Sequence, residues 1–351
     1  MAPAVPSNRP ESGVRWAGAE GCIEQILLQF ATVAGAKDFE HSSQYAQNGH
    51  VKLSHHPDYY LKQPPGHPFP MSKYQLIHEV VLERAVVTTE DIVAPAEAEM
   101  ADLLRVHTAE YLEKMATGAL TAPEQRRLGL TWSPALWRRS KLAVQGTLDA
   151  ARRALSDGLS GNLAGGTHHA FADRGEGFCV LNDVATAIRA LQAQGAIERA
   201  LIVDLDVHQG NGTAQIFSED ASVFTFSIHG QKNYPAVKMR STLDVGLPDG
   251  TSDEAYLDAL GANLPRVLDA FRADVVFYLA GVDVAAGDRY GRFALTDEGV
   301  RARDARVLHE VLGRGVPLVV TLAGGYATSS RRTAELHAIV FEEAVLALSA
   351  K

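Results

Sequence analysis

The clearest hydrophobic pattern in the chain is a short apolar run, bounded by polar residues, at Ala200–Asp206. A run of this kind is expected of a β-strand that is buried on both faces of a sheet. A helix is predicted before it, because Asn182 or Asp183 can cap a first turn and Gly195 follows the last apolar residue at helical spacing. Three more apolar runs predict strands at Val223–Ile228, Val275–Ala280 and Pro317–Leu322.

Helical patterns alternate with these strands. A further short strand is predicted at Asn162–Ala164, and helices are predicted at Met71–Arg84, Thr213–Phe217, Asp253–Phe271, Glu298–Leu312 and Arg331–Leu348. Strands separated by helices form βαβ units, so the predicted fold class is α/β, with a single domain and a mainly parallel β-sheet flanked by helices on both faces. In such sheets ligands bind at the loops that follow the carboxyl ends of the strands.

Composition divides the chain into two segments. Residues 1–50, with a proline-rich start and a polar end, are predicted to form an N-terminal extension of unknown role. Residues 51–351 are predicted to form the globular domain, which opens with a loop rich in Pro, His and Tyr at His55–Pro70.

Charge and cysteine content narrow the possible functions. Acidic residues outnumber Lys and Arg by 42 to 33, and no basic cluster is interleaved with aromatic residues, so nucleic acid is not an expected partner. Neither a signal peptide nor an apolar segment of membrane-spanning length is recognisable. Cys22 and Cys179 are the only cysteines and lie far apart, which favours a reducing compartment and predicts a cytoplasmic location.

Three predicted strand ends carry side chains that suit a metal site. Asp204, Asp206 and His208 end one strand, Asp283 ends another, and Tyr326 follows two glycines at the third. In an extended segment, side chains two residues apart point to the same side, so Asp204, Asp206 and His208 are predicted to lie on one side, where a carboxylate and an imidazole two residues apart can reach one cation. With Asp283 as a third ligand, a fourth position would stay open, as in catalytic zinc sites.

An isolated Asp-x-His can simply cap a helix, so this metal site needs further support. Asp204 provides some, because it lies in an otherwise apolar strand, where it needs a cation or a buried hydrogen-bond partner. The paired histidines His168 and His169 follow two glycines, which suits a water-activating site. The other pair, His55 and His56, is expected to be a chance surface pair.

In four ordered blocks the chain resembles the zinc-dependent histone deacetylases, which share their fold with acetylpolyamine amidohydrolases and acetoin-utilisation proteins. The blocks are Gly166–Asp183, Val203–Thr213, Ala280–Asp288 and Gly324–Tyr326, and the resemblance extends from about Val51 to Leu346. The segments Gln209–Gly212 and Tyr234–Pro235 look most like the class IV branch and its bacterial relatives. The resemblance implies an arginase/deacetylase-like fold and a catalytic domain at 51–351.

The resemblance also implies roles for the polar residues of these blocks. His169 would be the general base, and His168 would be its electrostatic partner, oriented by Asp204. Asn211 falls where some relatives have a second carboxylate that orients a histidine, and an amide stabilises an imidazolium less well. The ligands of a single zinc ion would be Asp206, His208 and Asp283.

A substrate channel and a second cation follow from the same resemblance. Tyr326 would polarise the scissile carbonyl, Phe178 would line a narrow acyl-lysine channel, and the Gly177 carbonyl would accept the substrate amide proton. Tyr234 and Gly325 would complete the substrate contacts. A structural potassium ion would be held by Asp204, Asp206, His208, Ser227 and Ile228.

The predicted function is therefore that of a zinc-dependent amidohydrolase that removes acetyl or longer acyl groups from the side-chain amine of acyl-lysine in proteins or peptides. Its alternatives are a deacetylase of acetylpolyamines or other small acyl-amines, and a non-catalytic protein that binds acyl-lysine. An arginase-like enzyme with two manganese ions would need more carboxylates than Gln209 and Ala285 supply. Lys73 falls where many relatives have an arginine near the acetate exit, or is a solvated lysine at a helix start.

Overall fold

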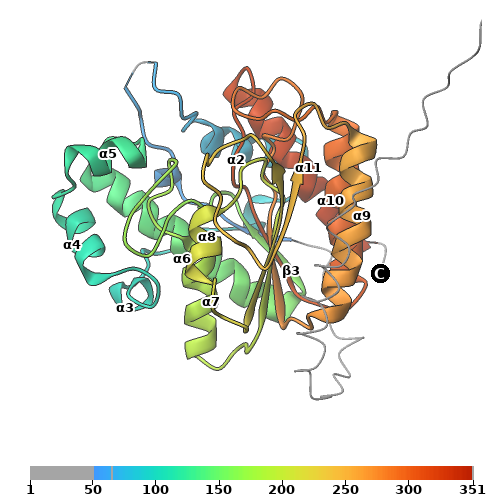
Figure 1. The fold of residues 1–351 in the computed structure, drawn as a ribbon, viewed down its shortest axis with the longest axis horizontal. Coiled ribbons are helices and arrows are strands. Elements are labelled where there is room, and N and C mark those ends of the chain that lie inside the picture. The colour runs from blue at the N-terminus through green and yellow to red at the C-terminus, as the bar shows by residue number, and fades with distance from the viewer. Residues whose placement is uncertain (1–50, 65, 350–351) are drawn as a thin grey trace, which may run out of the picture.

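A single eight-stranded sheet forms the centre of the computed structural model, which describes residues 51–64 and 66–349 (Figure 1). Every strand pair is parallel, and the order is β2-β1-β3-β8-β7-β4-β5-β6. The predicted α/β fold with a parallel sheet is confirmed, and the predicted extension, 1–50, lies outside the described residues. The strands are β1 (Lys52–Ser54), β2 (Ile92–Val93), β3 (Leu159–Asn162), β4 (Ala200–Asp204), β5 (Val223–Gly230), β6 (Leu243–Leu247), β7 (Val275–Leu279) and β8 (Leu318–Thr321).

Helices connect these strands and cover the sheet. Two short 3-10 helices lie at Pro57–Tyr59 and Thr89–Asp91. The α-helices are α2 (Lys73–Glu83), α3 (Met100–Leu103), α4 (Ala109–Thr117), α5 (Ala122–Leu128), α6 (Pro134–Asp157), α7 (Asp183–Ala193), α8 (Asn211–Ile216), α9 (Asp253–Ala270), α10 (Asp297–Leu312) and α11 (Ser330–Ser349). Within the described ranges, no helix combines the length and the apolar character needed to cross a membrane.

The predicted elements differ from the observed ones mainly at their ends. Asn182, one of the two residues predicted to cap this helix, is the N-cap of α7. Its side chain accepts a hydrogen bond from the Ala185 N–H. The strand predicted at Asn162–Ala164 is wrong in its bounds, because β3 ends at Asn162. The chain then turns at Gly165 and Gly166, whose φ angles are 77° and 72°.

The central strands are buried on both faces, as their apolar runs predict. In β7, Phe277 and Leu279 pack in one cluster with side chains of α7, whereas Val276 and Tyr278 pack in another with side chains of α10 and α11. Figure 1 shows α6 and α7 over one face and α9, α10 and α11 over the other. The middle strands β3, β8, β7 and β4 are neighbours, so the loops after their carboxyl ends meet at one edge of the sheet.

Candidate active site and metal centre

The loops after β4 and β7 bring together a buried trio of metal-type ligands, Asp206, His208 and Asp283. Nδ1 of His208 lies 3.0 Å from Oδ1 of Asp206 and 3.1 Å from Oδ2 of Asp283. In a tetrahedral zinc site with bonds of ~2.0–2.1 Å, neighbouring ligand atoms lie about 3.3 Å apart. The donor types and their spacing therefore fit one divalent ion, and no second group of three such ligands occurs among the described residues.

Backbone N–H groups hold both carboxylates of the trio. Asp206 accepts hydrogen bonds from the N–H of His208, at 2.9 Å, and from the N–H of Gly324, at 2.6 Å. Asp283 accepts one from the N–H of Val207 at 2.9 Å. A Cβ atom at Gly324 would lie 2.0 Å from Oδ2 of Asp283, so only glycine allows this close approach.

The chain reaches this arrangement by a bend and not by the predicted alternation along a strand. β4 ends at Asp204, and the backbone bends at the next residues, including Asp206 and His208. Asp204 instead faces His168. The predicted same-side alternation is therefore wrong, although Asp206 and His208 do converge on Asp283.

Burial and mutual contact shift the ionisation of the trio. Burial raises the pKa of Asp283 to about 6, and the nearby Asp206 carboxylate acts in the same direction. Burial lowers the pKa of His208, but hydrogen bonds to both carboxylates outweigh it and raise this pKa to about 10. At neutral pH the His208 imidazole therefore carries a proton that a metal ion must displace.

A buried arginine links the two loops that carry the trio. Arg303, in α10, is fully buried and donates from Nη1 to the carbonyl oxygens of Leu205, at 3.3 Å, and Gly281, at 2.5 Å. Asp304 compensates its charge through contacts of 2.9 Å from Nε and 2.8 Å from Nη2. No sequence pattern singles out Arg303 as a site residue, and its only signal is an Arg-Asp pair at core-facing positions of a predicted helix.

The loop after β3 presents the two predicted histidines. Asp183, at the start of α7, accepts hydrogen bonds from the N–H groups of Gly166, at 3.0 Å, and Thr167, at 2.8 Å. A Cβ atom at Gly165 would lie 2.4 Å from Asp183, which explains why a glycine occupies this turn. The turn places the rings of His168 and His169 4.1 Å apart.

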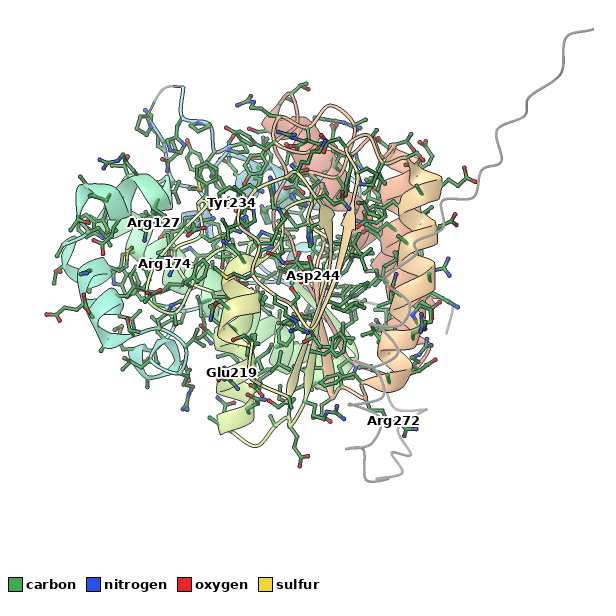
Figure 2. The ribbon with its side chains drawn as sticks, viewed as in Figure 1. Arg127, Arg174, Glu219, Tyr234, Asp244 and Arg272 are labelled. Carbon is green, nitrogen blue, oxygen red and sulfur yellow. The ribbon has the colours of Figure 1, made fainter. Side chains whose placement is uncertain are left out.

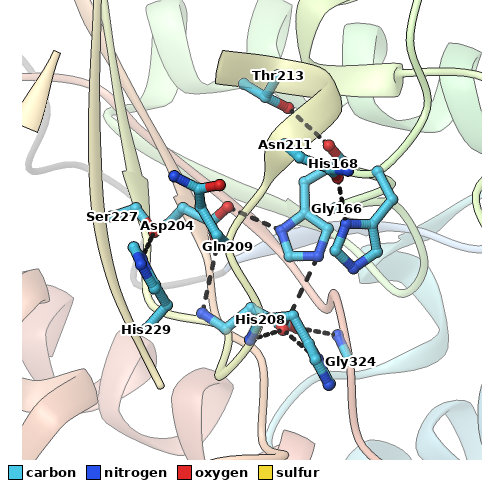
Figure 3. Close-up of polar contacts among 12 residues, drawn as sticks. Gly166, His168, Asp204, His208, Gln209, Asn211, Thr213, Ser227, His229 and Gly324 are labelled. Carbon is cyan, nitrogen blue, oxygen red and sulfur yellow. Dashed lines mark hydrogen bonds and ion pairs between the residues drawn. The ribbon is translucent and has the colours of Figure 1, made fainter. Parts of the chain in front are cut away.

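The two histidines have different partners (Figure 3). Nδ1 of His168 lies 2.7 Å from Oδ2 of Asp204, whereas Nδ1 of His169 lies 2.7 Å from Oδ1 of Asn211. Burial lowers the pKa of His168, but Asp204 and Asp206 outweigh it and raise this pKa to about 9. Burial, with His168 and His208 nearby, holds the pKa of His169 well below its usual range. His168 is therefore cationic and His169 neutral at pH 7, and the predicted need of Asp204 for a buried partner is confirmed.

A narrow cavity of about 30 Å³ reaches two members of the trio, Asp206 and His208, and both histidines. Gly177, Phe178 and Tyr326, which were predicted as site residues, line it together with Gly324, which was not. Phe69, from the proline-rich loop, also lines it and was missed because that loop has no periodic pattern. Phe69 and Tyr326 also border an adjacent hollow of about 520 Å³ at the surface.

Two predicted substrate contacts lie outside this lining. Gly325 is buried behind it, where a Cβ atom would meet Val282 and His337. Tyr234 is 42% exposed, and its ring centroid lies 4.9 Å from that of His169, with the ring planes perpendicular. Tyr234 therefore borders His169 at the protein surface without lining the inner cavity.

Lys73 lies beneath Tyr326, and the alternative of a solvated lysine is wrong. Its side chain is fully buried, Nζ donates to the Ala323 carbonyl at 2.9 Å, and Nζ lies 5.6 Å from the centroid of the Tyr326 ring. The helix start that suggested solvent exposure is covered because α2 packs against α11.

The residues predicted to hold potassium lie on the neighbouring strands β4 and β5 and in the loop after β4. Asp204 pairs with Ser227 across the two strands, and Ile228 is fully buried. The Ser227 hydroxyl lies 3.0 Å from Nδ1 of His229, as Figure 3 shows.

Comparison with known proteins assigns this arrangement to a family. The family described as "Histone deacetylase domain" matches residues 67–342. An uncharacterised protein of Picosynechococcus sp. is 44% identical over 297 residues, which cover 85% of this chain and 97% of that protein. Histone deacetylase 2 of Arabidopsis thaliana is 32% identical over 275 residues, which cover 76% of this chain and 71% of that protein.

Among solved structures, the crystal structure of the HDA15 HD domain superposes with a TM-score of 0.67 at 25% sequence identity. The match covers 86% of this chain and 92% of that domain. The family match spans most of the chain, and it includes the ligand trio, the histidine pair and Tyr326. The chain therefore belongs to the histone deacetylase family.

Proposed function

We propose that this member of the histone deacetylase family is a zinc-dependent amidohydrolase that removes acyl groups from the side-chain amine of acyl-lysine. One observation carries the proposal: two members of the ligand trio, two buried histidines and a tyrosine all line a single narrow cavity. A hydrolytic site needs these groups within reach of the same bond.

Asp206, His208 and Asp283 would hold the zinc ion. Bound there, zinc would supply polarisation of the amide carbonyl and lower the pKa of a bound water to ~7. Two carboxylates and one imidazole also suit Fe(II) or Co(II), so the donor set supports a divalent ion and zinc is the proposed one.

His169 would accept the proton of the attacking water through Nε2, because its Nδ1 faces Asn211. Its low pKa keeps it neutral and able to accept a proton at pH 7. His168, held cationic by Asp204, would stabilise negative charge beside it. Two neighbouring histidines whose environments push their pKa values apart suit the roles of base and electrostatic partner.

Tyr326 would donate a hydrogen bond to the oxygen of the scissile carbonyl. Burial, with Asp283 and Asp206 nearby, raises the pKa of the Tyr326 hydroxyl well above its usual range. The hydroxyl therefore keeps its proton, and its hydrogen bond would strengthen as negative charge develops on the substrate oxygen.

The aromatic side chains in the lining of the cavity, Phe69 and Phe178, support an apolar, aliphatic substrate chain. The ring centroids of Phe69 and Phe178 lie 5.2 Å apart at its wall, and the Gly177 carbonyl would accept the substrate amide N–H. An acetylpolyamine could pass the same walls. Acyl-lysine in a peptide is the preferred substrate because the adjacent hollow of about 520 Å³ gives room for a peptide backbone.

The alternatives receive less support. A two-manganese enzyme would need a second group of ligands, and the described residues offer one trio. A non-catalytic binding protein would not need the trio, both histidines and Tyr326 together. We extend the proposal to a potassium ion at Asp204, Asp206, His208, Ser227 and Ile228, and to a catalytic domain at 51–351. The cytoplasmic location stays a prediction.

The proposal is tested by turnover of lysine peptides with acyl groups of increasing length, and of an acetylated polyamine, by zinc-loaded protein. We expect hydrolysis of acyl-lysine and a fall in kcat of about 100-fold or more for Tyr326→Phe. Tyr256→Phe, at a tyrosine of α9 that lines neither the cavity nor the adjacent hollow, is the control and should keep wild-type kcat. Binding of these peptides without hydrolysis at any acyl length, or full activity of Tyr326→Phe, would contradict the proposal.

A further inference from the structure

The hydrogen bond between His169 and Asn211 depends on which way the Asn211 amide faces. An amide presents an oxygen that accepts on one side and an NH₂ group that donates on the other, with nearly the same shape. A carboxylate at this position would have no such ambiguity. Asn211 can hold His169 in one tautomer only if another group fixes the orientation of its amide.

We propose that Glu176 is this group: it orients the Asn211 amide and thereby fixes the tautomer of His169. The proposal deepens the proposed function, since it rests on His169 as the base of that reaction. Glu176 has no role among the sequence predictions, although it lies two residues before Phe178.

The hydrogen bonds determine the donor at each step. Oε1 of Glu176 lies 2.9 Å from Nδ2 of Asn211, and a carboxylate accepts hydrogen bonds, so the amide nitrogen faces Glu176. Oδ1 of Asn211 then faces His169 at 2.7 Å and can only accept. The proton of neutral His169 must therefore be on Nδ1, which leaves the lone pair on Nε2.

Glu176 is itself held firmly. Its side chain is 14% exposed, Oε1 accepts a hydrogen bond from the Tyr234 hydroxyl at 2.5 Å, and Oε2 lies 3.5 Å from Nε of Arg174. Tyr234 and Arg174, both labelled in Figure 2, belong to different loops. With Asn211, three donors surround this carboxylate, which leaves it poorly placed to bind a substrate cation as well.

The backbone of Glu176 belongs to a tight turn that packs on His169. Glu176 and Cys179 exchange two backbone hydrogen bonds of 3.0 and 2.8 Å across Gly177 and Phe178, whose φ angles are 55° and 68°. Positive φ at both central residues is the pattern of a type I′ turn. A Cβ atom at Gly177 would lie 2.7 Å from the His169 ring, so one turn supports both the ring and the carboxylate.

Asn211 is too buried for bulk water to take over the role of Glu176. Its exposed fraction is 2%, and its Nδ2 would lose its carboxylate partner if Glu176 were removed. The amide could then turn its NH₂ group toward His169. That orientation demands an acceptor at Nδ1 and moves the proton to Nε2, which is the wrong tautomer for a base.

A double-mutant cycle between Glu176→Ala and Asn211→Asp tests the proposal, with kcat and KM measured on an acyl-lysine peptide. We expect Glu176→Ala alone to lower kcat about 10- to 100-fold with KM within twofold. An aspartate at 211 has only acceptor oxygens, so it needs no orienting group, and it faces Glu176 as a like charge. In the Asn211→Asp background, Glu176→Ala should therefore leave kcat unchanged or raise it.

Asp173→Ala is the matched control, since Asp173 is an exposed acidic residue of the same loop that pairs with Arg174, and its loss should leave kcat unchanged. If Glu176→Ala does not fold, Glu176→Leu keeps most of the side-chain volume and the same pattern is expected. Equal loss from Glu176→Ala in both backgrounds would overturn the proposal, because a purely structural role is not rescued at position 211. A wild-type kcat in the Glu176 variants would also overturn the proposal.

NMR of the imidazole nitrogens separates this proposal from the proposed function. We expect a single His169 tautomer, protonated at Nδ1, in the wild type, and loss of that state in Glu176→Ala with its return in the double variant. The same tautomer in all variants would overturn the role of Glu176. Absence of turnover by the wild type would contradict the proposed function, and the NMR result would still decide the role of Glu176.

Discussion

The candidate site has a floor, formed by Asp206, His208 and Asp283, and a mouth, formed around Tyr234 and Glu176. These two regions are held in different ways. At the floor, Asp206 and Asp283 are fully buried and accept hydrogen bonds from backbone N–H groups of the loops at neighbouring strand ends. At the mouth, Tyr234 is 42% exposed, and Glu176 is held by side chains from other loops. The sheet therefore fixes the geometry of the floor, whereas contacts between side chains fix that of the mouth.

This difference predicts how each region responds to change. Substitutions at the floor should alter the metal content and the free energy of unfolding together, because the same backbone segments hold the ligands and pack in the core. Substitutions at the mouth should alter the rate of turnover while metal content and folding persist.

Asp283→Ala should have the largest effect, because it removes one of three ligands from the floor. We expect loss of bound zinc and a fall in kcat/KM on the order of a thousandfold or more. Metal analysis after dialysis and steady-state kinetics would measure both. Asp297→Ala, at a surface ion pair with Arg332, is the control. Stoichiometric zinc in Asp283→Ala would show that the trio is not the metal site.

Arg303→Met should weaken the floor without touching a ligand. Asp304 would become a buried charge without its partner, which costs about 3–5 kcal/mol of the free energy of unfolding. Zinc affinity should fall about 10-fold or more, because the carbonyls of Leu205 and Gly281 lose their shared donor.

Denaturant unfolding and zinc titration separate these two effects of Arg303. Adding Asp304→Leu should recover stability but not zinc affinity. Arg306→Met, at an exposed position of the same helix, should change neither. Wild-type zinc affinity in Arg303→Met would mean that Arg303 serves the core alone.

Zinc affinity should depend on pH with a defined sign. The pKa of His208 is raised to about 10, so the imidazole is protonated at pH 7 and zinc must expel that proton. We expect the Kd for zinc to rise about tenfold for each unit of pH below the His208 pKa. The rise should steepen below pH 6, because Asp283, with a pKa of about 6, then also binds a proton.

Calorimetry in buffers of different ionisation enthalpy measures the protons released when zinc binds. We expect about one proton per zinc at pH 7. A value of zero would contradict the assignment of His208 as a zinc ligand.

Tyr234→Phe should have the smallest effect, since it removes one of three donors to Glu176 at the mouth. Loss of one hydrogen bond worth about 0.5–1.5 kcal/mol predicts a fall in kcat of about two- to tenfold, with zinc content unchanged. Tyr256→Phe, at a tyrosine that lines neither the cavity nor the adjacent hollow, is the control and should have no effect. Loss of zinc from Tyr234→Phe would erase the distinction between floor and mouth.

The floor could be predicted from the sequence because it depends on local rules. Apolar runs locate the strands, and carboxyl ends of adjacent parallel strands meet, so Asp206 and Asp283 were placed together correctly. The burial of Asp204 required a partner, and His168 provides it. The error at the floor was the path of the chain, since no residue type between Asp204 and His208 marks the end of the strand.

The mouth could not be predicted in the same way because its contacts join distant segments. Glu176 meets Asn211 across 35 positions of sequence and Tyr234 across 58, and neither pairing leaves a local pattern. Lys73 is buried by a helix more than 250 residues away, whereas a lysine at a helix start is normally solvated. Residue type alone did not reveal these partners.

We propose that one zinc ion, held by Asp206, His208 and Asp283, makes this protein an acyl-lysine hydrolase. Titration of metal-free protein with zinc, during hydrolysis of an acyl-lysine peptide, tests it most directly. We expect the rate of peptide hydrolysis to rise linearly with added zinc and to stop rising at one zinc ion per chain. A break at two ions per chain, or no hydrolysis at saturating zinc, would contradict it.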